Sequence, residues 1–171
     1  GTAILATDRE SHLRKVLNAD TLDKAKKFFR KISIVEDAIT AFKTGGVHAM
    51  HDPTEGGIAG GIHEMADASQ LGFRIEEKKI STSPETRQIC NFYRIDPLQL
   101  ISSGSLLISA EPASAENIIK RLNEKKVPAS IIGEFTKNQP KRTIVKKSGR
   151  TEELPRPASD HLWRALAKKR P

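Results

Sequence analysis

The chain has 171 residues, 37% of them hydrophobic, and a formal net charge of +8, so it is long enough to bury a core as one domain. No apolar run approaches the roughly 20 residues that cross a bilayer, and no signal-peptide pattern opens the chain, which favours a cytoplasmic protein without a membrane partner. A single cysteine, Cys90, excludes a disulfide framework and a multi-cysteine metal site.

The positive charge is concentrated at the C-terminal end. Residues 1–136 carry 18 basic and 18 acidic side chains, whereas residues 137–171 carry 11 basic and 3 acidic ones. Such a segment is a candidate to bind nucleic acid or another polyanion. Its ordinary alternative is a solvated tail and a helix end, at which lysine and arginine are favoured. One Trp and one Tyr are too few for a base-stacking surface, so nucleic acid is the less favoured partner.

The first third of the chain is predicted to contain one strand and three helical segments. Residues 1–6 are typical of a short buried strand, and residues 7–18 include a short helix. Residues 21–31 have helical spacing, and a third helix begins with a capping box at Ser33 and Glu36 and stops at Gly45. The side chains expected to face the core here are Leu13, Val16, Leu17, Leu22, Ala25, Phe28, Phe29, Ala38, Ile39 and Phe42.

Helices and strands continue to alternate towards the C-terminus. Strands are expected at residues 47–50, 73–76, 105–109, 129–134 and 142–145. Helices are expected after the glycine-rich stretch near residue 56, then at residues 84–93, 114–126 and 159–167. The last helix is anchored by Leu162, Trp163 and Leu166 and belongs to a basic segment, residues 155–171. This interleaving predicts an α/β or α+β layered domain.

Residues 51–66 join a predicted strand to a glycine-rich helix. Asp52 or Thr54 in the connecting turn is a candidate helix cap. Each glycine in the first two helical turns costs roughly 0.5–1 kcal/mol relative to alanine, which predicts that a packed neighbour or a ligand lies close to the backbone. Free N–H groups at a helix start also suit a phosphate. Both interpretations stay open for Gly56, Gly57, Gly60 and Gly61.

Titratable side chains near this stretch have ordinary interpretations as well as functional ones. His48 and His51 suggest a metal pair, but residues three apart on a strand point to opposite faces, so no metal site is expected. His51 is a candidate to contact a substrate or a loop carbonyl. Glu64 fits a surface salt bridge better than an acid–base pair with Glu55. Cys90 lies in an apolar setting and is expected to be a small buried hydrophobe.

At the residues His51-Asp52-Pro53-Thr54-Glu55-Gly56-Gly57, the chain resembles the C-terminal domain of the aminoimidazole-ribonucleotide (AIR) synthetase superfamily. That superfamily includes the hydrogenase-maturation dehydratase, selenophosphate synthetase, thiamine-monophosphate kinase and formylglycinamidine synthetase. The order and spacing of further motifs agree, so the resemblance covers nearly the whole chain to about Trp163. Those motifs are residues 64–66, residues 95–98 with 102–108 (a second loop), and the strand Ile131-Ile132-Gly133-Glu134. The best match is to AIR synthase-related proteins with a hydrogenase-maturase-like C-terminal half.

The resemblance implies a three-layer α/β/α domain with a ferredoxin-like mixed sheet, and ATP-dependent phosphoryl transfer that activates an oxygen atom of a small-molecule substrate. ATP and Mg are expected in a separate N-terminal domain, so this chain would be a fragment that is inactive alone and holds no cofactor itself. Its partners would be the substrate and that domain, with a homodimer as a further possible assembly. The substrate- or phosphate-binding residues carried over are Asp52, Thr54, Gly56, Gly57, Ser103 and Gly104, with His51, Glu55 and Glu64 as additional candidates.

Two departures limit what the resemblance implies. Hydrogenase-maturation proteins commonly have Arg where this chain has Glu55, and a carboxylate repels a phosphate. Those proteins also end in a cysteine-bearing tail, whereas residues 167–171 read Ala-Lys-Lys-Arg-Pro. The dehydratase reaction is therefore not carried over, and a non-catalytic ligand-binding or assembly module remains the alternative function. Polyanion binding through the basic C-terminus is a third.

Overall fold

The computed structural model describes residues 1–168, so Lys169, Arg170 and Pro171 of the basic segment lie outside the described part. Its α-helices are α1 (Thr2–Asp8), α2 (Glu10–Leu13), α3 (Ala19–Lys26), α4 (Val35–Thr44), α5 (Gly57–Ser69), α6 (Pro84–Tyr93), α7 (Pro112–Glu124) and α8 (His161–Ala167). Short 3-10 helices are η1 (Lys27–Lys31), η2 (Glu77–Lys79) and η3 (Pro97–Gln99). The strands are β1 (Val47–His51), β2 (Gly72–Glu76), β3 (Leu107–Ala110), β4 (Gly133–Thr136), β5 (Arg142–Val145) and β6 (Thr151–Glu153).

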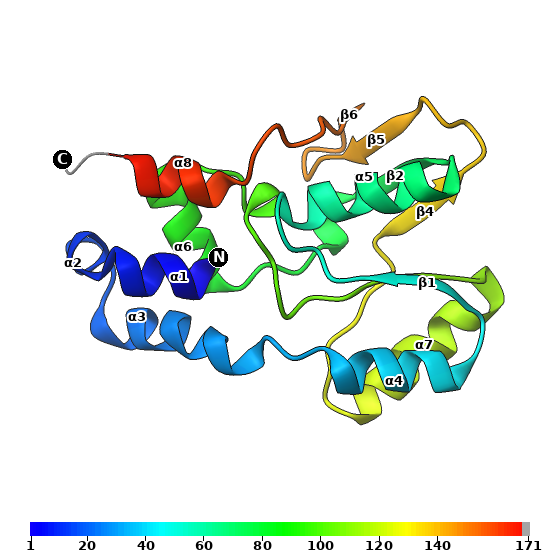
Figure 1. Ribbon diagram of the computed structural model, residues 1–171, viewed down its shortest axis with the longest axis horizontal. Coiled ribbons are helices and arrows are strands. Elements are labelled where there is room, and N and C mark those ends of the chain that lie inside the picture. Colours follow the sequence, from blue (N-terminus) through cyan, green and yellow to red (C-terminus); the bar gives the residue numbers. More distant parts are fainter. Residues whose placement is uncertain (169–171) are drawn as a thin grey trace.

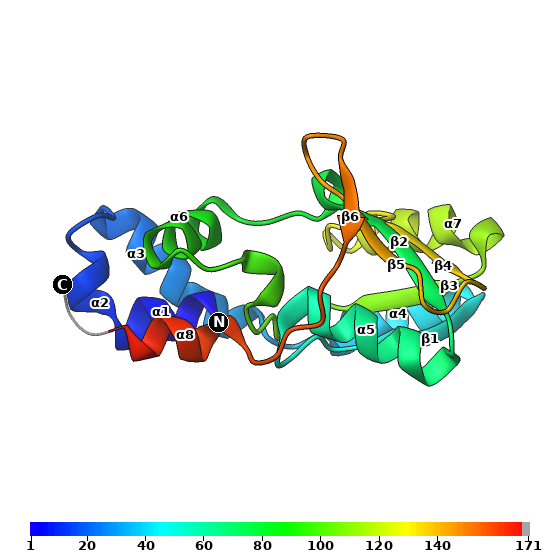
Figure 2. The same ribbon diagram turned by 90° about the horizontal axis from the view of Figure 1, so that it is seen from above.

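The molecule is elongated, with a helical end and a mixed end (Figures 1 and 2). Helices α1, α2, α3, α6 and α8 gather at the first end, so the first and the last helix of the described chain lie there together. They share one apolar core, built from Leu5, Ala6, Leu13, Leu17, Leu22, Ala25, Ile89, Cys90, Tyr93, Ile95, Leu100, Leu162 and Ala165. The N-terminal and C-terminal segments are therefore packed together with α6, which comes from the middle of the chain.

The strand expected at residues 1–6 is wrong, because this segment forms helix α1. Ala3, Leu5 and Ala6 are buried at helical positions against the neighbouring helices. Alanine and leucine are the best helix formers, and an apolar run this short does not distinguish a buried strand from a buried helix. Tertiary packing at the helical end decides the conformation.

Val16, Phe29 and Trp163, which were expected in the core, are 52%, 47% and 55% exposed. Val16 follows the end of α2, and Phe29 lies in the 3-10 helix after α3, so the 3.6-residue period no longer applies to them. Trp163 lies on the solvent side of α8, whose buried positions are Leu162 and Ala165. For Val16 and Phe29 the helical period was extended past the helix end, whereas Trp163 was assigned to the wrong face of α8.

Helix α4 differs from its prediction in its N-cap and in the face that it buries. Ile34 is the N-cap and no side chain caps the helix, so the Ser33–Glu36 capping box is not formed. Ala41 is fully buried in a small core with Ile118 and Leu122 of α7. Ile39 and Phe42, expected inward, therefore face solvent. The stop at Gly45 is confirmed, with a left-handed φ of 88°.

The strands form two sheets with helices on their faces. Strands β1 and β3 pair antiparallel, and the second sheet has the order β4-β2-β5-β6, in which β2 and β5 are parallel and the other pairs antiparallel. Helix α5 packs on the four-stranded sheet and contacts β1 and β3, while α4 and α7 contribute to the core on the other side of β1. The layered α+β class is confirmed, with the strands divided between two sheets. No helix within residues 1–168 has the length and apolarity to cross a bilayer.

Candidate functional site

The glycine-rich helix start is capped by a residue from the other end of the chain. Gly56 is the N-cap of α5 in the left-handed conformation, with φ of 75°, and neither Asp52 nor Thr54 caps the helix as expected. The Gly56 N–H instead donates to Oδ2 of Asp160 at 2.7 Å. Asp160 is 4% exposed, so this is a buried bond to a carboxylate. Asp160 thus provides a negative charge where the positive end of the helix favours one.

Close backbone packing explains the other glycines of α5. A Cβ on Gly57, whose φ is +59°, would lie 2.4 Å from the carbonyl oxygen of Leu100. A Cβ on Gly60 would lie 2.8 Å from the Glu55 carbonyl oxygen, and one on Gly61 would lie 2.9 Å from the His51 ring. Any such contact is shorter than van der Waals packing allows. The packing interpretation of these glycines therefore holds for this helix start.

The second loop lies directly beside the first. The Ser102 N–H donates to the Pro53 carbonyl oxygen at 3.1 Å, which joins the two predicted motifs. Gly104 has φ of +94°, and a Cβ there would lie 2.3 Å from the Lys31 carbonyl oxygen. Thr54, Glu55 and Ser103 remain exposed. The sequence-predicted residues therefore come together in one surface region, hereafter the two-loop surface: Asp52, Thr54, Glu55, Gly56, Gly57, Ser103 and Gly104.

Residues 160 and 161 hold both loops at once. Asp160 also caps α8, because its Oδ1 accepts from Leu162 N–H at 2.7 Å. Nδ1 of the adjacent His161 accepts from the Asp96 N–H at 2.9 Å, at the start of η3. Sequence reasoning missed both contacts, although Asp before an apolar helical run is a cap signal. The C-terminal segment is therefore part of the site's framework.

The Gly56 and Gly57 amides already have hydrogen-bond partners within the chain. The Gly56 N–H is used by Asp160, and the Gly57 N–H donates to the Thr54 carbonyl oxygen at 3.0 Å. Within residues 1–168, no group of three or more His, Cys, Asp or Glu side chains could hold a metal ion. Oδ1 of Asp52 is buried and has no hydrogen-bond partner in the described part. Ligand binding by the two-loop surface stays a prediction.

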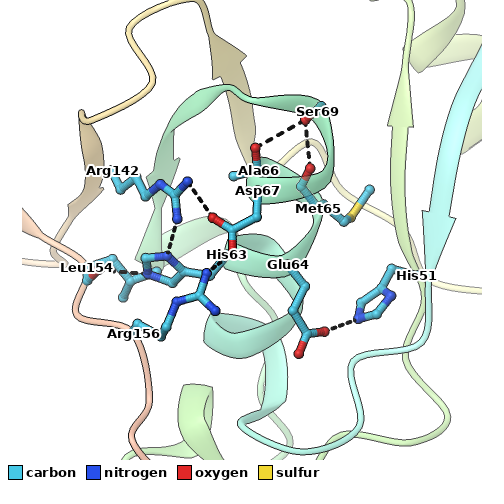
Figure 3. A network of polar contacts seen from close by, with 10 residues as sticks. All are labelled: His51, His63, Glu64, Met65, Ala66, Asp67, Ser69, Arg142, Leu154 and Arg156. Carbon is cyan, nitrogen blue, oxygen red and sulfur yellow. Dashed lines mark hydrogen bonds and ion pairs between the residues drawn. The ribbon is translucent and has the colours of Figure 1, made fainter.

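His51 and Glu64 line a neighbouring cavity of about 730 Å³. His51 Nε2 lies 2.7 Å from Glu64 Oε2, which is within ion-pair distance (Figure 3). The angles at these two atoms do not fit a hydrogen bond. His48 lines the same cavity. The register of β1 shifts between Val47 and Ala49, and this bulge breaks the alternation. The remaining lining residues are Ala49, Met50, Met65, Ala68, Ser69, Leu71, Ser109 and Phe135.

The opposite side of α5 carries a polar network centred on His63, which is 4% exposed (Figure 3). Nε2 of His63 donates to the Leu154 carbonyl oxygen at 2.9 Å, and Nδ1 accepts from Arg142 at 3.1 Å, so the ring is neutral. Arg142 and Arg156 both pair with Asp67. Burial is the main cause that lowers the pKa of His63, and the two arginines lower it further. The hydrogen bond to the Leu154 carbonyl acts in the opposite direction and raises this pKa. This network ties α5 to the second sheet and the C-terminal segment.

Curated relatives match about half of the chain. Carbamoyl dehydratase HypE of Rhizobium leguminosarum bv. viciae is 37% identical over 92 residues, covering 53% of this chain and 25% of that protein. A putative hydrogenase expression/formation protein of Methanocaldococcus jannaschii is 38% identical over 93 residues, covering 53% of this chain and 28% of that protein. The matched region is therefore a minor part of each relative's length.

Solved structures share the fold over most of this chain. E. coli HypE, a hydrogenase maturation protein, has a TM-score of 0.69 at 27% identity, covering 77% of this chain and 42% of that one. Thiamine monophosphate kinase from Aquifex aeolicus shares the fold with a TM-score of 0.59 at 16% identity, covering 89% of this chain and 48% of that one. The family model described as AIR synthase related protein, C-terminal domain, matches residues 6–146. With this match over most of its length, the chain belongs to the family of AIR synthase related proteins, of which it has the C-terminal domain.

Proposed function

We propose that this chain is the substrate-side half of an ATP-dependent AIR synthetase-superfamily enzyme, which activates an oxygen atom of a small molecule by phosphoryl transfer. The observation that carries the proposal is the Ser102–Pro53 hydrogen bond, which joins the two loops into one surface. The side chains of Thr54 and Ser103 are exposed on that surface, and half-buried Asp52 lies beside them. These groups suit the binding of a polar substrate.

ATP and Mg are assigned in this proposal to an N-terminal half that pairs with this chain. Related proteins of greater length support it, since HypE is known in complex with ATP and the Aquifex kinase in complex with AMPPCP and TMP. The amides of Gly56 and Gly57 are already bonded within the chain, and Glu55 adds a negative charge nearby. The two-loop surface therefore contacts the substrate, while the phosphates are held opposite it.

Each polar group of the two-loop surface has an expected role. The half-buried carboxylate of Asp52 accepts a hydrogen bond from a substrate N–H or O–H, and loss of such a partner costs about 1–3 kcal/mol. The hydroxyls of Thr54 and Ser103 donate to substrate oxygens. The carboxylate of Glu55 disfavours an anionic group at the helix start. The substrate part that meets this surface is accordingly neutral and polar.

Calorimetry and a turnover assay test the proposal together. Titration of the 171-residue chain with Mg-ATP is expected to give no binding heat. The complete two-domain protein is expected to hydrolyse ATP when supplied with a suitable amide, carbamoyl or phosphate compound. Asp52→Asn should lower kcat/KM at least about tenfold without changing ATP affinity, because it weakens one charged hydrogen bond to the substrate. The matched control is Asp23→Asn, at an exposed position of helix α3.

A non-catalytic ligand-binding or assembly module is the second candidate. The carboxylate of Asp160 at the Gly56 amide favours it, since an internal group occupies the helix start that a ligand would use. Absence of ATP hydrolysis by the complete protein with every compound class would support this candidate and reject the first. Polyanion binding is less supported, because Arg156 is paired with Asp67 and α8 is packed in the core. Salt-insensitive behaviour on heparin would remove it.

A further inference from the structure

The cavity of about 730 Å³ lies between helix α5 and the sheet of β1 and β3, and it is hereafter the α5–β1 cavity. One face of this sheet packs on α4 and α7 through Met50 and Ile108. Side chains alternate along a strand, so Ala49 and its pairing partner Ser109 lie on the opposite face. Both of these residues line the cavity. The cavity is therefore the part of this second face that α5 leaves uncovered.

Small side chains keep this space open. Helix α5 meets the sheet at Gly61, where an added Cβ would lie 2.9 Å from the His51 ring. Ala68 is seven residues further along α5 and on the same side of the helix, and it lines the cavity opposite Ala49 and Ser109. Both Ala49 and Ala68 count as exposed, so the space between them opens to the solvent.

The larger side chains around the cavity are apolar. Met65, Leu71 and Phe135 line it from α5, from the turn after α5 and from β4. Figure 3 shows Met65 on the side of α5 that faces His51. A volume of about 300–1,000 Å³ with mainly apolar walls and a few polar groups is typical of small-molecule sites. The α5–β1 cavity fits this description.

One carboxylate supplies the charge of the α5–β1 cavity. Among residues 1–168, Glu64 is the only acidic residue that lines it, and no lysine or arginine does so. Within the same range, the only ion-pair partner of Glu64 is His51. The Glu64 side chain is 54% exposed, so a ligand has access to it. A cationic ligand would therefore meet a carboxylate that no lysine or arginine of the described chain neutralises.

We propose that the α5–β1 cavity binds a small aromatic cation, that is, a planar ring that carries a protonated amine or amidine group. The ring lies against Met65 and Phe135, because thioethers and aromatic rings both pack favourably with an aromatic ring. The cationic group donates a charge-assisted hydrogen bond to Glu64. This site is separate from the two-loop surface, and the proposal does not depend on the proposed function.

Benzamidine, benzamide and benzoate test the charge preference, because they have nearly the same shape and carry a positive, a zero and a negative charge. The chain has a formal net charge of +8, so non-specific attraction would favour benzoate. We expect benzamidine to bind the 171-residue chain with a dissociation constant on the order of 1 mM, as suits so small a ligand. Benzamide should bind at least about threefold more weakly, and benzoate more weakly still.

The titrations are followed by amide chemical shifts at pH 8, where histidine side chains are ordinarily uncharged. Shift changes should cluster at Ala49, Ala68 and Leu71. Changes centred on Thr54 and Ser103 would instead assign the compound to the two-loop surface and overturn the proposal. Equal affinities for benzamidine and benzoate, or no saturable binding of benzamidine, would also overturn it. No ATP enters these titrations, so their failure is distinct from a failure of the proposed function.

Glu64→Gln separates the charge from the apolar walls. It should weaken benzamidine binding at least about threefold and leave benzamide binding unchanged, because it removes the charge and keeps the shape. Glu116→Gln, at an exposed position of α7, is the matched control. Equal affinities of these two variants for benzamidine would reject the role of Glu64.

Ala68→Leu tests the cavity itself. The added side chain occupies the space of the ring, so binding of both benzamidine and benzamide should be lost. Ala113→Leu, at an exposed position of α7, is the matched control and should bind both compounds like the parent. Circular dichroism checks that each variant stays folded. Unchanged benzamidine binding by a folded Ala68→Leu variant would place the compound outside the α5–β1 cavity and reject the proposal.

Discussion

Asp160 and Gly56 are 104 residues apart in sequence and are joined by a buried hydrogen bond of 2.7 Å. The bond connects the start of α8 to the start of α5, so one carboxylate serves two helix N-termini. A buried amide with a charged acceptor is held more firmly than one with a neutral acceptor. The stability of the two-loop surface therefore depends on the C-terminal segment.

Asp160→Ala should lower the free energy of unfolding by about 2–4 kcal/mol, because it leaves the buried Gly56 N–H without an acceptor and α8 without its cap. Asp160→Asn keeps one carbonyl oxygen and should lose about half as much. Urea denaturation of the three proteins measures the differences. A loss below about 0.5 kcal/mol for the alanine variant would contradict the role of this bond.

Gly57→Ala should destabilise the protein by at least about 2 kcal/mol, since it combines a left-handed φ with a clash against the Leu100 carbonyl oxygen. Gly45→Ala is the matched control, because Gly45 also has a left-handed φ, +88°, but nothing lies within 4 Å of its added Cβ. The difference between the two variants isolates the contact with the second loop. Equal losses in thermal or urea unfolding would show that this contact is unimportant.

Acid should destabilise the protein through His63. Burial lowers the pKa of His63 in the folded state below its ordinary 6.5, so the unfolded chain binds the proton first. This contribution to stability is fully present above pH 6.5 and falls below it, by at most about 1.4 kcal/mol per pH unit, until the folded-state pKa is reached.

His63→Gln provides the comparison, because glutamine can also donate to Leu154 and accept from Arg142. The free energy of unfolding of both proteins is measured in urea above and below pH 6.5. The variant should lose less stability on acidification than the parent. An identical pH dependence of the two would mean that His63 titrates normally in the folded protein.

Cys90 should be unreactive in the folded protein. It is 1% exposed, and burial raises the pKa of its thiol to about 12, so little thiolate forms near neutral pH. A thiol reagent should label the chain only when urea unfolds it, and the labelling rate then reports opening of the helical core. Fast labelling of the folded protein would contradict this burial.

Much of the fold follows from local pattern. Helices α5, α6 and α7 and strands β1, β2 and β5 agree with their predicted segments, since each has a clear apolar period or a strong stop signal. Strand β6 was not predicted because Thr151-Glu152-Glu153 has no apolar alternation and is ordered by pairing with β5. Helix α1 was misassigned because its short apolar run fits either conformation.

The site could be predicted only in part. The two loops were placed together by family resemblance, and the Ser102–Pro53 bond gives the physical reason for their proximity. No sequence signal predicts the bulge in β1 near His48, so the two histidines were expected on opposite faces. No local sequence pattern predicts the partner of the Gly56 amide, because the packing of α8 in the helical core is what brings Asp160 to it.

The family match ends at residue 146, yet several groups that organise α5 lie beyond it. Leu154 accepts from His63, Arg156 pairs with Asp67, and Asp160 holds Gly56. A chimera that takes this domain only as far as residue 146, where the family match ends, would contain both loop motifs. It would lack the three residues that hold α5 through these contacts. The transferable unit of this domain therefore extends through α8, and its boundary is set by hydrogen bonding instead of by sequence similarity.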